Sequence, residues 1–161
     1  MENDFLMEIG VSGLTSRLKR LSDSLLYSTR DFYNSEGLEI EPNWHVIFLL
    51  FQKNDTLTIT EISEALQLSH PGIVKLINKM KKKGYITSIP DAEDSRKQQL
   101  QLSEKAHKEL PKLEAYWKAG IQTIDDLLED NPEFMALLEK LEQKVAESNF
   151  KERTLNNYYH D

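Results

Sequence analysis

The segment from residue 57 to residue 102 constrains the fold of this chain most, because its helix signals follow one another in a definite order. Thr58 and Glu61 have the spacing of a capping box, which starts a short helix. After a short turn, Ser69 is a suitable N-cap for a second helix, and Gly84 is suited to end that helix. The order predicts a helix–turn–helix unit.

Two short strands are predicted directly after this unit. Residues 85–89 and residues 97–102 are typical of strands, and the connecting residues 90–96 have the proline, aspartate and serine content of a loop. A hairpin in this position forms a wing. The sequence therefore predicts a winged helix-turn-helix over about residues 43–102, within a mainly helical chain.

The second helix of this unit carries the positive charge of the region. Between Ser69 and Thr87 there are five lysines and no acidic residue. The whole chain has a formal charge of −7, so the remaining residues sum to −12. An acidic protein with one cationic helix confines its affinity for polyanions to that helix, which favours DNA binding at a single place. The lysines are Lys75, Lys79, Lys81, Lys82 and Lys83.

This lysine-rich helix has one apolar side and one polar side. At 100° per residue, the side that packs on the core carries Ile73, Leu76, Ile77 and Met80. The opposite, free side carries Pro71, Val74, Lys75, Asn78 and Lys82. We expect the phosphates of DNA to be neutralised by Lys75, Lys79 and Lys82. The residues placed to meet base edges are Ser69, His70, Val74 and Asn78.

Apolar stripes flank the winged helix on both sides. The helix predicted over about residues 11–35 has leucines at 4-3-4 spacing, namely Leu14, Leu18, Leu21 and Leu25. Residues 103–149 are predicted to form two helices. The first is long and capped by Ser103, and Pro111 is predicted to kink it near its start. These stripes pack on one another within a monomer or on a second copy. Two DNA half-sites need two recognition helices, which favours a second copy.

Two further segments complete the predicted single domain of residues 1–161. The helix over residues 43–52 is apolar nearly all round, so we expect it to be central and buried. The end of the chain, residues 150–161, is polar and is expected to be frayed or to depend on a partner.

Several classes of function lack their sequence signals. The chain has no cysteine, which excludes disulfides, Cys-based zinc sites and thiol redox sensing, and fits a cytoplasmic protein. It has no stretch long and apolar enough for a membrane span, no signal-peptide pattern, no glycine-rich phosphate loop, no nucleophile elbow and no HExxH motif. We therefore predict no enzymatic activity and no cofactor.

The segment 57–102 resembles the MarR (multiple antibiotic resistance regulator) family of bacterial transcription factors. The similarity covers the helix–turn–helix in LTITEISEALQLSHPGIVKLINKMKKKGYI and the wing in DAEDSRKQQLQLS. Its most specific element is Asp94-Ser95-Arg96, which is similar to the D-x-R signature of the family's wing. The chain departs from the usual pattern at Gln67, where many such turns have glycine, and at Ala106.

The resemblance implies roles for the wing and for the assembly. Arg96 at the wing tip is expected to enter the minor groove, with Asp94 holding the wing or the arginine in position, and Lys97 beside them belongs to the same DNA-binding surface. The family's plan is a homodimer whose N- and C-terminal helices interleave. A dimer of this kind binds a pseudo-palindromic operator in double-stranded DNA.

The resemblance also implies a small aromatic or anionic effector, bound between the dimerisation helices and the winged helix. Candidate pocket residues are Trp44, His45, Phe48, Tyr116 and Trp117. For any single one of the aromatic residues, the sequence favours an ordinary place in the core. A metal site is not predicted, because the four histidines include no His-x₃-His pair and no thiolate accompanies them.

Two classes of function remain open on the sequence. The first is a dimeric, sequence-specific transcriptional regulator, which we expect to be a repressor released by a ligand. The second is a winged-helix module that binds proteins and does not read DNA. The net charge of a dimer, about twice −7, gives the second some support, because it repels non-specific DNA.

Overall fold

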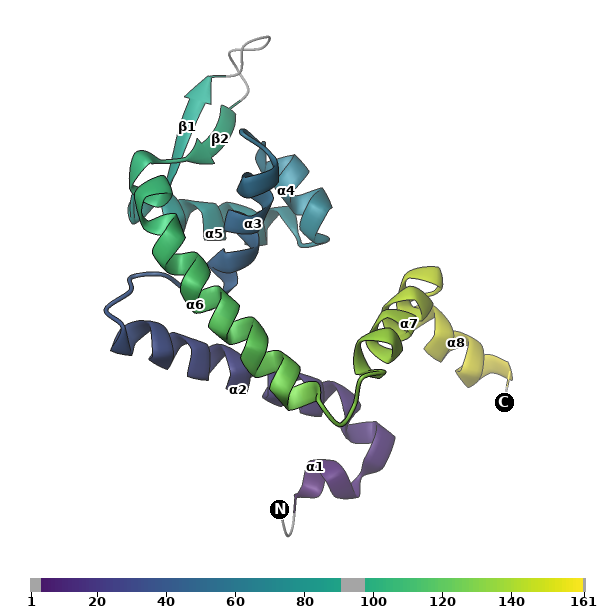
Figure 1. Cartoon of the computed structure of the whole chain (residues 1–161). Coiled ribbons are helices and arrows are strands. Elements are labelled where there is room, and N and C mark those ends of the chain that lie inside the picture. Colours follow the sequence, from purple (N-terminus) through teal and green to yellow (C-terminus); the bar gives the residue numbers. More distant parts are fainter. Residues whose placement is uncertain (1–3, 91–97, 161) are drawn as a thin grey trace. The chain divides into compact units, whose positions relative to one another are not determined.

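The computed structural model describes residues 4–90 and 98–160, which form helices and one small sheet (Figure 1). The chain divides into two compact units, residues 1–111 and residues 112–161. The elements in chain order are α1 (Phe5–Glu8), η1 (Gly10–Gly13), α2 (Leu14–Ser35), η2 (Pro42–Trp44), α3 (His45–Lys53), α4 (Ile59–Leu66), α5 (His70–Lys82), β1 (Ile86–Pro90), β2 (Gln98–Leu102), α6 (Glu104–Leu128), α7 (Phe134–Glu147) and α8 (Phe150–His160). The predicted class, mainly α with a small β-wing, is confirmed.

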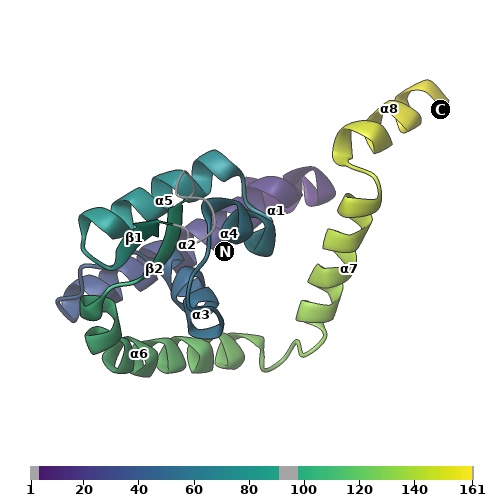
Figure 2. The same cartoon turned by 90° about the horizontal axis from the view of Figure 1, so that it is seen from above.

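In the first unit, α3, α4 and α5 gather around the two strands (Figures 1 and 2). Their apolar sides form a shared core with the strands, whose fully or almost fully buried members are Ile47, Phe48, Ile62, Ile73, Ile77, Met80, Tyr85, Ile86 and Leu100. The expectation that the helix over residues 43–52 is central and buried is correct for one side of the helix and wrong for the other. Val46 and Leu49 are 39% and 40% exposed, because α3 packs on the core along one side only.

The sheet is an antiparallel hairpin. β1 and β2 pair from Ile86 opposite Leu102 to Pro90 opposite Gln98. Leu57, in the segment before α4, adds a bridge to Leu100, with its N–H donating to the Leu100 carbonyl at 3.0 Å. This bridge attaches the base of the wing to the start of the helix–turn–helix.

The leucine stripe of α2 is uncovered in the single chain. Leu14, Leu18, Leu21 and Leu25 are all exposed, although α2 extends over 22 residues, close to its predicted length. An apolar stripe of this length needs a cover.

None of the described helices is long and apolar enough to cross a membrane.

The second unit contains the later part of α6, then α7 and α8. The apolar residues of α7 that were predicted as a stripe include the exposed Leu137 and Leu141. Of the two alternatives expected for residues 150–161, frayed or dependent on a partner, the first is corrected, because residues 150–160 form α8. Asn149 caps this helix: the Glu152 N–H donates to Asn149 Oδ1 at 3.1 Å, and Glu152 Oε2 accepts the Asn149 N–H at 3.1 Å.

Candidate nucleic-acid interface

The turn between α4 and α5 is built from local hydrogen bonds. The predicted capping box is present, with Thr58 N–H donating to Glu61 Oε2 at 2.7 Å and Glu61 N–H donating to Thr58 Oγ1 at 3.2 Å. α4 ends at Gln67, whose φ of +54° is in the left-handed region that suits glycine best. The Ser63 hydroxyl donates to the Leu68 carbonyl at 2.6 Å and fixes the turn. The helices before and after the turn are therefore held at a defined angle.

α5 presents one polar side to solvent. Its N-cap is Ser69, as predicted, and the buried Ile73 and Met80 fix the opposite side in the core. The predicted DNA-contacting residues Ser69, His70, Pro71, Lys75, Asn78, Lys79 and Lys82 are exposed, and Val74 is half-buried. Seven of these eight residues thus lie in α5, and the eighth, Ser69, is its N-cap.

The lysines of this region differ in their partners. Lys79 Nζ donates to Glu41 Oε1 at 2.8 Å, and Lys83 Nζ donates to Glu39 Oε1 at 2.9 Å. The hydrogen bond and charge of Lys83 lower the pKa of Glu39. Within the described part of the chain, neither Lys75 nor Lys82 has an ion-pair partner. Both side chains are exposed, so both ammonium groups are free to meet phosphate.

A hollow of about 380 Å³ lies beside the N-terminus of α5. Lys75 and Lys79 line it, together with Ser69 and Gly72 at the start of the helix. A Cβ atom at position 72 would lie 3.0 Å from Ser69 Oγ, so glycine keeps the N-cap uncrowded. Unpaired N–H groups at a helix N-terminus and nearby lysines favour an anion, which matches a backbone phosphate.

Tyr85 anchors the region between α5 and the wing. Its ring packs edge-on against Trp44 and Phe48, with centroids 5.6 and 5.7 Å away. Its hydroxyl donates to Glu109 Oε2 at 2.6 Å, and the Lys105 Nζ lies 4.3 Å from the ring centroid. Burial, and secondarily the Glu109 carboxylate, raises the pKa of the hydroxyl, so Tyr85 remains a neutral donor.

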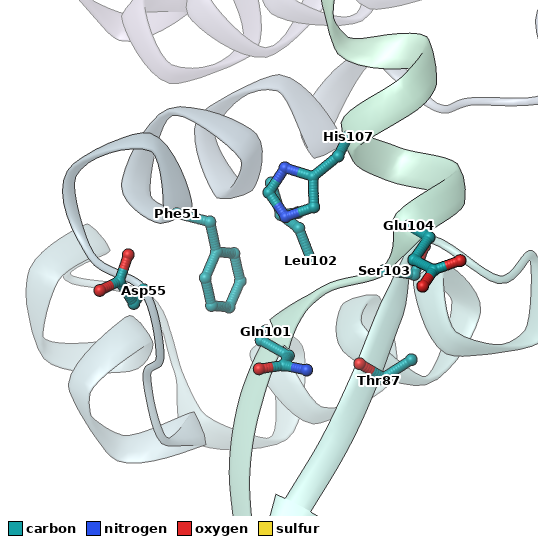
Figure 3. Close-up of a pocket in the computed structure, with 8 residues that line it drawn as sticks. All are labelled: Phe51, Asp55, Thr87, Gln101, Leu102, Ser103, Glu104 and His107. Carbon is teal, nitrogen blue, oxygen red and sulfur yellow. The ribbon is translucent and has the colours of Figure 1, made fainter.

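A second hollow, of about 490 Å³, lies away from α5, at the base of the wing (Figure 3). Its walls come from the end of α3, both strands and the start of α6, with Phe51 and His107 facing into it. The charged lining residues are the two carboxylates Asp55 and Glu104. This lining is unsuited to the anionic effector that the family resemblance implies.

The residues predicted to form an effector pocket lie in different surroundings. Trp44 and Phe48 are buried against Tyr85, which gives them a structural role, although Trp44 also lines the hollow beside α5. His45 is half-buried, and this burial lowers its pKa. Tyr116 and Trp117 belong to the second unit. Among the described residues, no three histidine or carboxylate side chains are grouped so as to hold a metal ion.

The prediction for this site included three residues of the wing and omitted two glutamates. Asp94, Arg96 and Lys97 lie outside the described residues. Glu39 and Glu41 were not predicted from the sequence, and they pair with lysines about 40 positions away. The signal that the sequence offers is a match of spacings. Two glutamates stand two positions apart around an isoleucine, and the two lysines that they meet stand four positions apart on a helix.

The similarity to known structures is extensive in length and low in identity. A Staphylococcus aureus MepR–DNA complex superposes with a TM-score of 0.70 at 22% identity, over 82% of this chain and 97% of that one. An Escherichia coli MarR variant bound to operator DNA superposes with a TM-score of 0.64 at 19% identity, over 89% of this chain and 99% of that one. A MarR/EmrR family transcriptional regulator from an Acinetobacter species superposes with a TM-score of 0.65 at 22% identity, over 83% of this chain and 95% of that one. No curated protein sequence matches this chain.

The fold and the exposed cationic side of α5 define a winged helix-turn-helix protein. Residues 38–97 match the MarR family model. This match bears out the resemblance to the MarR family that residues 57–102 predicted.

Proposed function

We propose that the chain is a DNA-binding transcriptional regulator that inserts α5 into the major groove. The observation that carries this proposal is the polar side of α5, where Lys75, Asn78 and Lys82 are exposed while the opposite side is fixed in the core. A rigidly packed helix with one cationic side fits the major groove of B-form DNA. Two of the similar structures are complexes with DNA, which supports the same function here.

We further propose that the chain acts as a homodimer. The uncovered leucines of α2 and the exposed Ile121, Ile124, Leu137 and Leu141 of α6 and α7 supply an apolar surface for a second copy. In this arrangement the winged helix of about residues 43–102 reads DNA, and helices on both sides of it hold the dimer together. A two-fold dimer reads a pseudo-palindrome with half-sites centred about 34 Å apart.

The regulator is proposed to repress transcription in the cytoplasm, where the operator is, and to release DNA when a small effector binds. An effector acts if it binds one spacing of the two winged helices better than another. A shift from nearly full to nearly zero occupancy needs about 5 kcal/mol of differential affinity. Because the hollow at the wing base is lined by carboxylates, an anionic effector requires a different site, which the dimer would provide.

The test of DNA binding compares two double variants with the same loss of charge. Lys75→Ala with Lys82→Ala removes the unpaired lysines of α5, whereas Lys118→Ala with Lys140→Ala removes exposed lysines of the second unit. The probe is a duplex selected by the wild-type protein from a random-sequence pool. We expect the α5 variant to bind weakly at all sequences, and its salt slope to be about two units shallower.

The control variant should keep both the affinity and the salt slope of the wild-type protein. Failure to select any duplex, or equal binding by the two double variants, would favour the alternative of a winged-helix module that binds proteins. That alternative retains some support from the net charge of −7.

A further inference from the structure

Two carboxylates from the segment between α2 and α3 lie against the lysine row of α5. Glu41 Oε1 accepts a hydrogen bond from Lys79 Nζ at 2.8 Å, and Glu39 Oε1 accepts one from Lys83 Nζ at 2.9 Å. The order is antiparallel, since the earlier glutamate meets the later lysine. The two pairs therefore form one continuous contact along the helix.

The spacings of the two partners match. Alternate residues of an extended segment lie on the same side, about 6.6 Å apart, while residues four apart on a helix are separated by a rise of about 6 Å. Glu41 is extended, with φ −104° and ψ 150°. Between the glutamates, Ile40 is only 4% exposed, so its side chain fixes the segment in the core. The Leu38 N–H donates to the Tyr33 carbonyl at 2.8 Å and ties the segment to the end of α2.

The paired lysines continue the row that starts with the unpaired Lys75. Lys75, Lys79 and Lys83 are four residues apart, so each lies near the next on the surface of α5. Lys75 and Lys79 line the same hollow at the start of the helix. Lys79 and Lys83 are thus paired with glutamates, whereas Lys75 has no ion-pair partner among the described residues.

We propose that Glu39 and Glu41 set the affinity of this protein for DNA by holding the ammonium groups of Lys79 and Lys83 away from the phosphates. This inference rests on the proposed function, because it requires α5 to bind DNA. The two ion pairs leave α5 with fewer phosphate contacts than its number of lysines would allow. Binding is consequently weaker and less dependent on salt, which limits retention on non-specific DNA.

The experiment measures binding of the selected duplex over a range of salt concentrations. Glu39→Gln with Glu41→Gln keeps the size of both side chains and removes their charge. Glu133→Gln with Glu147→Gln makes the same change of net charge at exposed positions of the second unit. We expect the first variant to bind roughly tenfold more tightly and its salt slope to be steeper by about two units, from two added phosphate contacts. The control should resemble the wild-type protein.

A double-mutant cycle identifies the lysine responsible. Lys79→Ala should have little effect on affinity in the wild-type background and a loss of several-fold in the Glu41→Gln background. An equal effect of Lys79→Ala in both backgrounds overturns the proposal, as does a Glu39/Glu41 variant that matches its control in affinity or slope. Circular dichroism checks the folding of each variant. Absence of duplex binding by the wild-type protein contradicts the proposed function itself and is thus distinguished from failure of this inference.

Discussion

The leucine stripe of α2 permits a quantitative test of the proposed dimer. Leu21 is 52% exposed in the single chain. Complete burial of a leucine side chain contributes about 2 kcal/mol, so covering the exposed half contributes about 1 kcal/mol per chain. A two-fold interface contains this contact twice, which gives about 2 kcal/mol per dimer. Since about 1.4 kcal/mol corresponds to a factor of ten, Leu21→Ala should raise the dimer dissociation constant about 30-fold.

Sedimentation equilibrium of the wild-type protein and of Leu21→Ala measures this constant directly. Leu68→Ala is the matched control, because Leu68 is also 52% exposed but lies in the turn before α5. It should leave the dimer unchanged. A stable wild-type monomer, or equal effects of the two substitutions, would refute the argument that a second copy covers α2. Leu21→Asp should be more severe, since it places an unpaired charge in the interface.

Three further predictions concern single side chains of the first unit. Tyr85→Phe should lower the free energy of unfolding by about 1–2 kcal/mol in urea denaturation, because it removes the 2.6 Å hydrogen bond to Glu109 and keeps the ring; Tyr158→Phe, at an exposed tyrosine of α8, should be neutral. Gln67→Gly should stabilise the fold by about 0.5–1 kcal/mol, since φ is +54°, and an unchanged thermal midpoint would contradict this reason. Burial lowers the pKa of His45 below its ordinary 6.5, so its contribution to stability is present above pH 6.5 and is lost as the pH falls through the lowered pKa. In His45→Gln this loss should disappear from urea titrations made at several pH values, and a persistent identical loss would assign it to another group.

Local signals explain what could be predicted from the sequence. The capping box at Thr58 and Glu61 and the N-cap at Ser69 act within four residues, so their spacing alone located α4 and α5. The exposed side of α5 followed from helical periodicity. The same kind of signal, Asn149 with Glu152, begins α8, but the polar composition of residues 150–161 concealed it.

Non-local contacts explain what could not be predicted. Lys79 looked like a phosphate ligand because its acidic partner Glu41 is 38 positions away. The apolar composition of α3 indicated burial, but it could not show that Val46 and Leu49 remain exposed in the single chain. Periodicity identifies an apolar side of a helix and leaves open whether the same chain or another one covers it.

The placement of α5 in the major groove is tested most directly by cleavage of DNA from a fixed position on the helix. The natural chain has no cysteine, so Asn78→Cys provides a unique thiol for an iron-chelate cleavage reagent. Gln143→Cys on α7 provides the control. On the selected duplex, the reagent at position 78 should cut both strands in two clusters about one helical turn apart, whereas the reagent at position 143 should leave these clusters uncut. Dispersed cleavage from position 78, or stronger cleavage from position 143, would contradict the account.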